Sequence, residues 1–76
     1  MRVLKLKDST SIKTASYSKQ EKKLTVTFMG GRTYDYQDVP ESTIDLFEEL
    51  AALKKGSVGS IFYGMIRNKF KYTKVD

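Results

Sequence analysis

The stretch from Leu24 to Pro40, LTVTFMGGRTYDYQDVP, decides the fold. Its first five residues alternate apolar side chains with threonines, which is the period of a half-buried strand. Gly30 and Gly31 supply a turn that tolerates positive φ, and a Tyr-Asp-Tyr segment then continues as a second strand. Pro40 ends the sheet because proline has no N–H for the ladder. The stretch therefore predicts a β-hairpin that leads into a helix.

The length of the hairpin loop decides where Tyr34 and Tyr36 point. A two-residue loop of Gly30 and Gly31 would place both tyrosines with the threonines. A three-residue loop that adds Met29 places all the apolar side chains on one face, because a one-residue slip inverts a strand. The longer loop is favoured since it separates apolar from polar residues. It makes the tyrosines core or core-edge residues first and ligand contacts second.

Two segments precede the hairpin. Residues 1–8 are interpreted either as an N-terminal edge strand guarded by lysines or as a basic arm. Residues 12–18 have a strand-like alternation that predicts two opposite faces. One face has Ile12, Thr14 and Ser16, and the other has Lys13, Ala15 and Tyr17. Three consecutive strands with short turns imply an antiparallel meander.

Two amphipathic helices are predicted after the hairpin. The first begins at Pro40, ends near Gly56 and turns inward a helical stripe of Ile44, Phe47, Leu50, Ala51 and Lys54, widened by Leu46 and Leu53. The second runs from Ile61 to about Phe70 with Ser60 as its cap, and its inward residues are Ile61, Phe62, Met65, Ile66 and Phe70. The predicted fold class is α+β: a small three-stranded meander, with residues 1–8 as a candidate fourth edge strand, and two helices packed on one face.

The composition excludes several kinds of chemistry. The 76 residues contain no cysteine and no histidine, so disulfides, zinc sites and Ser-His catalysis are not expected. No carboxylate has a recognisable catalytic partner, so we expect no enzyme, no cofactor and no metal. The absence of a long apolar run and of a signal peptide predicts a cytoplasmic protein without membrane partners. Because so small a chain buries little surface, a homo-oligomer is one expected route to stability.

The net charge of +5 is unevenly distributed along the chain. Residues 1–23 carry a net +5, residues 24–53 a net −5, and residues 54–76 a net +5. If both basic ends lie on one side, they form a cationic face suited to phosphates. The alternative interpretation is ordinary solubilisation by lysine.

Several short motifs together resemble a known family. They are Ile12 and Tyr17, Leu24-x-Val26-x-Phe28, the glycine turn, Tyr34-x-Tyr36, Asp38-Val39-Pro40, Ser57-x-Gly59 and Ile66-Arg67. In this order they resemble the KTSC domain, named for its place at the C-terminus of some lysyl-tRNA synthetases and also found as a free-standing protein. The resemblance covers residues 9–72, leaving residues 73–76 as a C-terminal tail, and it implies an RNA-binding role. The chain departs from the family pattern at Lys55, where alanine is usual, and at Tyr63, where asparagine is frequent.

The leading functional hypothesis is a non-enzymatic nucleic-acid-binding module, with RNA preferred. One alternative is an oligomeric protein that sequesters a small phosphate-bearing ligand such as a signalling nucleotide, and another is a protein-interaction adaptor. Tyrosines can stack on bases, arginines and lysines can neutralise phosphates, and the serine-glycine turn before the second helix can bind an anion or can simply be a capped turn. The candidate contacts are Arg32, Tyr34, Tyr36, Ser57, Gly59, Ser60, Tyr63, Arg67, Asn68, Lys69 and Lys71.

Overall fold

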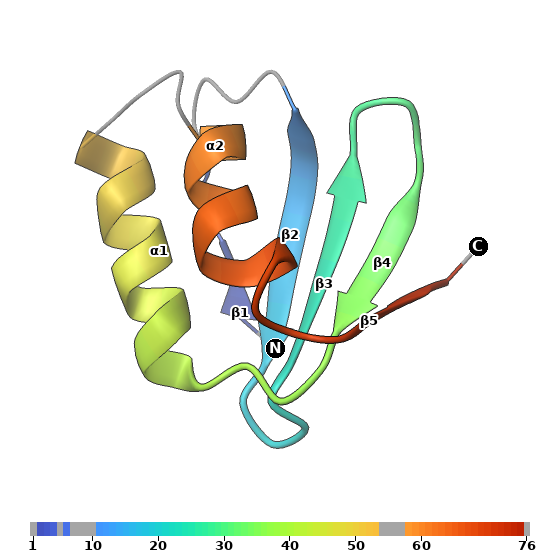
Figure 1. The fold of residues 1–76 in the computed structure, drawn as a ribbon, viewed down its shortest axis with the longest axis horizontal. Helices are drawn as coiled ribbons and strands as arrows, with labels where there is room; N and C mark the ends of the chain where they lie inside the picture. The colour runs from blue at the N-terminus through green and yellow to red at the C-terminus, as the bar shows by residue number, and fades with distance from the viewer. Residues whose placement is uncertain (1, 5, 7–10, 54–57, 76) are drawn as a thin grey trace.

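The fold is an antiparallel sheet with helices on one of its faces (Figure 1). It comes from a computed structural model that describes residues 2–4, 6, 11–53 and 58–75. Within these residues the sheet has five strands in chain order: β1 (Arg2–Val3), β2 (Ile12–Ser18), β3 (Lys23–Phe28), β4 (Thr33–Tyr36) and β5 (Tyr72–Lys74). The helices are α1 (Glu41–Leu53), α2 (Val58–Phe62) and the π-helix η1 (Tyr63–Arg67), which continues α2. The predicted α+β class is confirmed.

The sheet has two more strands than the core prediction of three. Arg2 and Val3 pair with β2, so the edge-strand interpretation of the N-terminus holds for these residues. The prediction of a C-terminal tail is wrong, since residues 72–74 pair with β4. All three side chains of β5 are exposed, and such a strand leaves no hydrophobic alternation in the sequence.

The hairpin has the three-residue loop that the separation of apolar and polar residues favoured. The Phe28 N–H donates to the carbonyl of Arg32 at 2.8 Å, and the Gly31 N–H donates to the carbonyl of Phe28 at 3.0 Å. Both loop glycines have positive φ, 102° and 95°. Val26 consequently lies opposite Tyr34, and the tyrosines share the apolar face.

The alternation predicted for β2 is wrong over part of its length. The register shifts between Ile12 and Thr14, which marks a bulge. The extra residue changes the face on which the following side chains lie. Ile12 is therefore buried together with Ala15 and Tyr17, and not with Thr14 and Ser16.

Helix α1 covers the sheet with a narrower stripe than predicted. It begins one residue after Pro40. Leu46 and Leu53, expected to widen the stripe, are exposed. Lys54 and Gly56 lie outside the described residues. The buried residues of the helix are Ile44, Phe47 and Ala51.

The second helix begins earlier than predicted and changes its winding. It starts at Val58, so Ser60 lies within α2 and is not its cap. Phe62 and Ile66 are buried, and the other three predicted inward residues pack against the core, as expected: Ile61, Met65 and Phe70. These contacts hold α2 and η1 over the apolar face of the sheet.

Candidate functional site

One wall of the candidate site is the inner face of the β3–β4 hairpin. Tyr36 lies opposite Leu24 and Tyr34 lies opposite Val26. Residues opposite each other in a ladder point to the same face, so both tyrosines point toward the helices. Arg32, two residues before Tyr34, is on this face as well and is exposed.

The opposite wall is the π-helix. Tyr63 and Arg67 are its first and last residues. The Asn68 N–H donates to the carbonyl of Tyr63 at 3.2 Å, and this bond to the fifth residue back characterises the wider π-turn. The guanidinium carbon of Arg67 lies 5.0 Å from the ring centroid of Tyr63, within the range of a cation–π contact. The π-turn thus places an arginine against an exposed aromatic ring.

Strand β5 adds a further tyrosine between these walls. Tyr72 lies opposite Tyr36, with 5.4 Å between their ring centroids, and its ring is 5.5 Å from that of Tyr34. The guanidinium carbon of Arg67 is 5.7 Å from the Tyr72 ring. Arg67 therefore contacts the rings of both Tyr63 and Tyr72.

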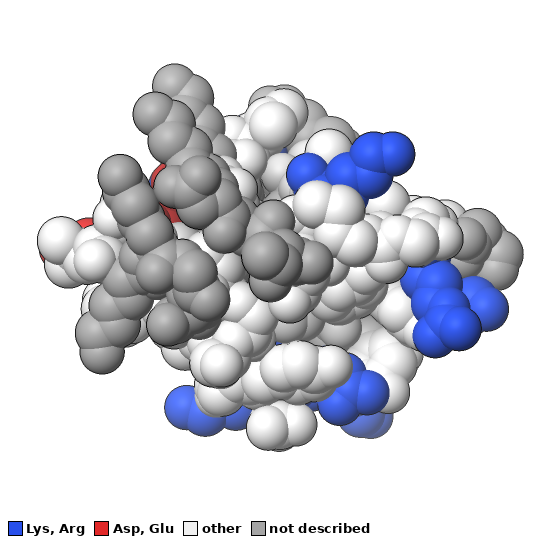
Figure 2. Space-filling view, turned by 90° about the horizontal axis from the view of Figure 1, so that it is seen from above, with Lys and Arg blue, Asp and Glu red and all other residues white. Residues whose placement is uncertain are grey.

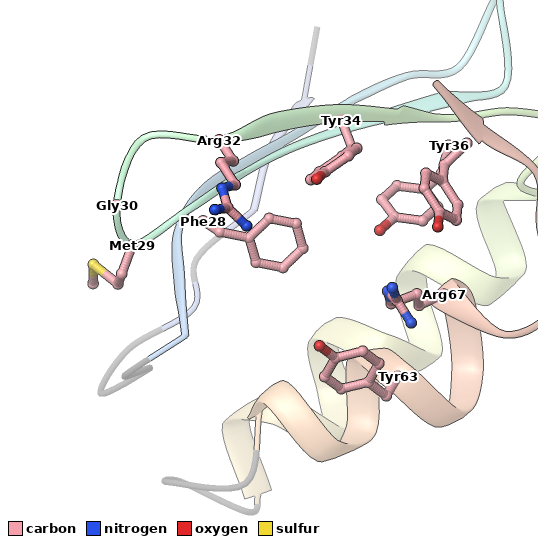
Figure 3. A pocket seen from close by; sticks show the side chains of 9 residues that line it. Phe28, Met29, Gly30, Arg32, Tyr34, Tyr36, Tyr63 and Arg67 are labelled. Atoms are coloured by element: carbon pink, nitrogen blue, oxygen red, sulfur yellow. The ribbon is translucent and has the colours of Figure 1, made fainter. Parts of the chain in front are cut away.

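These elements enclose a cleft of about 460 Å³ (Figure 3). It contains four phenols and two guanidinium groups, and no carboxylate of the described residues lines it. Asp35 lies between the two sheet tyrosines in sequence but points to the other face, where it accepts a hydrogen bond from Thr25 at 2.6 Å. The lining residues are Phe28, Met29, Gly30, Arg32, Tyr34, Tyr36, Tyr63, Arg67 and Tyr72.

The Tyr36 phenol is neutral over the whole physiological pH range. Burial raises the pKa of Tyr36 to about 12, although nearby Arg67 favours the phenolate. The phenol therefore keeps its proton near neutral pH and can donate a hydrogen bond there. Tyr36 is a fixed neutral donor beside a permanent cation.

Five of the predicted site residues line this cleft, and the basic residues after η1 do not. Lys69 lines a separate groove between α1 and η1. Lys71 joins β5 to the rest of the chain, and its carbonyl accepts the Gln37 N–H at 2.9 Å. Asn68 ends η1 through its backbone N–H. The predicted residues that do line the cleft are Arg32, Tyr34, Tyr36, Tyr63 and Arg67.

The serine-glycine turn also lies away from the cleft. Gly59 and Ser60 are inside α2, and neither lines the cleft. A β-carbon on Gly59 would come within 2.7 Å of the Ser11 Oγ, so this glycine permits close packing between segments. Ser57 lies outside the described residues.

Among the described residues, the basic side chains of the two chain ends do not gather on one cationic face. Strands β1 and β5 occupy opposite edges of the sheet. Arg2 forms ion pairs with Asp45 at 2.6 Å and with Glu48 at 2.5 Å, so two acidic residues of α1 compensate its charge. Figure 2 shows the Lys and Arg side chains of one face as separate groups along its right side and lower rim, with acidic side chains at the left edge, on the side of α1. The cations that surround the tyrosines are Arg32, Arg67 and Lys74, which lies opposite Tyr34.

Four residues that line the cleft are not among the contacts predicted from the sequence: Phe28, Met29, Gly30 and Tyr72. The sequence predicts Phe28 on the apolar face of the hairpin and Met29 and Gly30 in its loop. Tyr72 belongs to a strand whose three side chains are all exposed, so no hydrophobic alternation in the sequence indicates it. Three exposed large side chains, Met29, Tyr63 and Tyr72, meet at this cleft.

The described part of the chain has neither a metal centre nor a membrane span. No group of three or more acidic side chains is arranged to hold an ion among the residues that the structure describes. None of the helices in the same residues is long and apolar enough to cross a bilayer.

Comparison with known proteins assigns the family. The family model of the KTSC domain matches residues 8–70. This chain is a KTSC domain. A protein of Tsukamurella paurometabola is 33% identical over 64 residues, which cover 84% of this chain and 88% of that protein. The crystal structure of a KTSC domain protein from Yersinia pestis has a TM-score of 0.72 and 29% identity, and the match covers 90% of this chain and 89% of that one.

The KTSC match contains most of the cleft. It includes the hairpin with Tyr34 and Tyr36, and η1 with Tyr63 and Arg67. Tyr72 lies beyond its last matched residue, so β5 completes the cleft from outside the matched range. The resemblance inferred from the short motifs is confirmed over nearly the range predicted for it.

Proposed function

We propose that this KTSC domain is a non-enzymatic module that binds single-stranded RNA, with a base against the tyrosines of the cleft and phosphates on Arg32 and Arg67. The observation that supports this function is the composition of the cleft, whose described lining residues combine exposed aromatic rings with two arginines and include no carboxylate. A negatively charged lining group would repel the backbone of a nucleic acid, and the part of the lining that the structure describes has none.

The two kinds of side chain contribute differently to such binding. Stacking of a base on an aromatic ring is worth about 1–3 kcal/mol and tolerates any base. Tyr63 and Tyr72 are 48% and 46% exposed and can offer their rings. Guanidinium groups bind phosphate oxygens in a bidentate manner, which sets the register of the strand. Because paired bases hide their faces, the cleft favours a single strand.

A mononucleotide or other small phosphate-bearing ligand is the second candidate. The cleft volume of about 460 Å³ falls within the size range of small-molecule pockets. A domain that holds such a ligand without converting it would sequester it. An adaptor that pairs a partner strand with the sheet has less support, since the edge strands β1 and β5 have only 2 and 3 residues.

Charge reversal at matched positions tests the RNA proposal. Fluorescence anisotropy with a labelled eight-nucleotide RNA would compare the wild type with Arg32→Glu, Arg67→Glu and Lys69→Glu at low and moderate salt. Lys69 is two residues from Arg67 but lines the other groove, so it controls for net charge. We expect Arg32→Glu and Arg67→Glu each to weaken binding at least tenfold, and Lys69→Glu to weaken it less than threefold.

Two outcomes would contradict the proposal. One is the absence of RNA binding by the wild type at low salt and high protein concentration. The other is an equal loss for Lys69→Glu and Arg67→Glu, which would indicate non-specific attraction by net charge. A series from one to eight nucleotides separates the candidates, because affinity that stops rising at one nucleotide favours the small ligand.

A further inference from the structure

Tyr36 is a buried residue whose hydroxyl remains available. The residue is 1% exposed. Its hydroxyl has no hydrogen-bond partner among the described residues. In the same residues, every side-chain oxygen that is sealed from solvent has a hydrogen-bond partner. The hydroxyl must therefore reach solvent through the cleft, which Tyr36 lines.

The surroundings of this hydroxyl indicate what it can bind. Figure 3 shows the Tyr36 side chain extending from the sheet into the same space as the Arg67 guanidinium on η1. Tyr63 and Tyr72 hold that guanidinium by cation–π contacts, and Arg67 has no ion-pair partner in the described chain. A neutral O–H donor and a cation without an ion-pair partner in the described chain share this cleft, and together they form a site for an anionic oxygen.

We propose that the Tyr36 hydroxyl and Arg67 form a phosphate subsite, in which Tyr36 donates a hydrogen bond to an oxygen of the phosphate that Arg67 binds. This inference rests on the proposed function. It assigns to Tyr36 the recognition of the phosphate group and not of the base. The raised pKa of Tyr36 supports it, because the phenol keeps its proton beside the anion. The base is left to the more exposed rings of Tyr63 and Tyr72.

Tyr17 supplies a matched control for removing the hydroxyl. It is equally buried and lies on the far side of Leu24 from Tyr36 in the sheet, but its hydroxyl donates to the Val39 carbonyl and lines no part of this cleft. Tyr36→Phe removes the proposed contact and keeps the ring packing. Tyr17→Phe removes a buried hydroxyl elsewhere in the core.

The experiment compares a nucleoside with its phosphate ester. NMR titrations of the wild type, Tyr36→Phe and Tyr17→Phe would use uridine, uridine 5′-monophosphate and an eight-nucleotide oligouridylate, at a temperature at which all three proteins are folded. We expect Tyr36→Phe to weaken binding of the monophosphate and the oligonucleotide by five- to twentyfold and to leave uridine binding unchanged. Tyr17→Phe should leave all three affinities within twofold of the wild type.

The outcomes separate this inference from the proposed function. If the wild type binds the oligonucleotide and Tyr36→Phe binds it equally well, the subsite is wrong and the RNA proposal survives. An equal loss for uridine and its monophosphate also overturns the subsite, since it assigns Tyr36 to the base or to packing. If the wild type binds the monophosphate through Tyr36 but not the oligonucleotide, the subsite stands and the RNA proposal fails. Binding of none of the probes overturns both.

Discussion

Tyr17 and Tyr36 flank Leu24 from the two neighbouring strands, and the hydroxyl of only one of them is bonded within the protein. The Tyr17 hydroxyl donates to the carbonyl of Val39, just before α1, at 2.5 Å. The Tyr36 hydroxyl opens into the cleft instead. Two buried residues of the same type therefore have different roles: Tyr17 joins the sheet to the segment that enters the helix, and Tyr36 faces the candidate ligand.

The first prediction concerns the stability of the two phenylalanine variants. Tyr17→Phe should lower the free energy of unfolding by about 1–3 kcal/mol, because it leaves the buried Val39 carbonyl without its partner. Tyr36→Phe should change it by less than about 0.5 kcal/mol, since no internal hydrogen bond is lost. Urea denaturation followed by circular dichroism measures both. A larger loss for Tyr36→Phe than for Tyr17→Phe would contradict the assignment.

The second prediction is a loss of stability at alkaline pH. Burial raises the pKa of Tyr36 to about 12, against a value near 10 in the unfolded chain, and burial raises the pKa of Tyr17 as well. Between these pH values the unfolded state releases phenolic protons that the folded state keeps, so stability falls as the pH rises. The contribution is fully present below pH 10 and is lost toward pH 12.

Thermal melts at a series of pH values, with an absorbance titration of the phenolates, test this dependence. Above pH 10 the melting temperature of Tyr36→Phe should fall less steeply with pH than that of the wild type. An unchanged slope in the variant would show that Tyr36 is not the group that titrates.

The third prediction concerns the hairpin loop. Gly31→Ala should destabilise the fold by about 1–2 kcal/mol, because φ at this position is 95° and an L side chain rarely adopts it. Space is not the reason, since a β-carbon there meets nothing within 4 Å. Gly64→Ala is the matched control: its β-carbon is equally unhindered, but it lies in the helical segment, so it should stabilise the protein by up to about 1 kcal/mol. Equal effects in urea denaturation would argue against the positive-φ loop.

The fourth prediction concerns the link between β1 and α1. Arg2→Ala should lower the free energy of unfolding by about 0.5–1 kcal/mol at low salt, because it removes partly exposed ion pairs to Asp45 and Glu48. The effect should shrink in 1 M NaCl, where such pairs are screened. Lys13→Ala, at an exposed position with no ion pair in the described chain, is the control. A salt-independent loss for Arg2→Ala would assign it to packing of the arginine side chain.

The candidate site could be predicted only in part from the sequence. Arg32, Tyr34 and Tyr36 were identified because they follow one another in the hairpin, whose register depends on local turn chemistry. Arg67 and Lys69 are both candidate contacts in the sequence, whereas the π-turn and the helix end direct them to different grooves. No local pattern in the sequence predicts the π-helical winding of η1. Tyr72 was assigned to the end of the domain, since a three-residue exposed strand has no hydrophobic signal of its own.

The sequence by itself determined the hairpin, the face on which its tyrosines lie and the helices that cover that face, because alternation, loop glycines and apolar stripes act between near neighbours. Only the tertiary structure decided that β5 returns beside β4, that the terminal strands β1 and β5 stand at opposite edges, and that Tyr36 and Arg67 share one cleft. These relationships join segments distant in the chain, and their geometry follows from the packing of the whole domain.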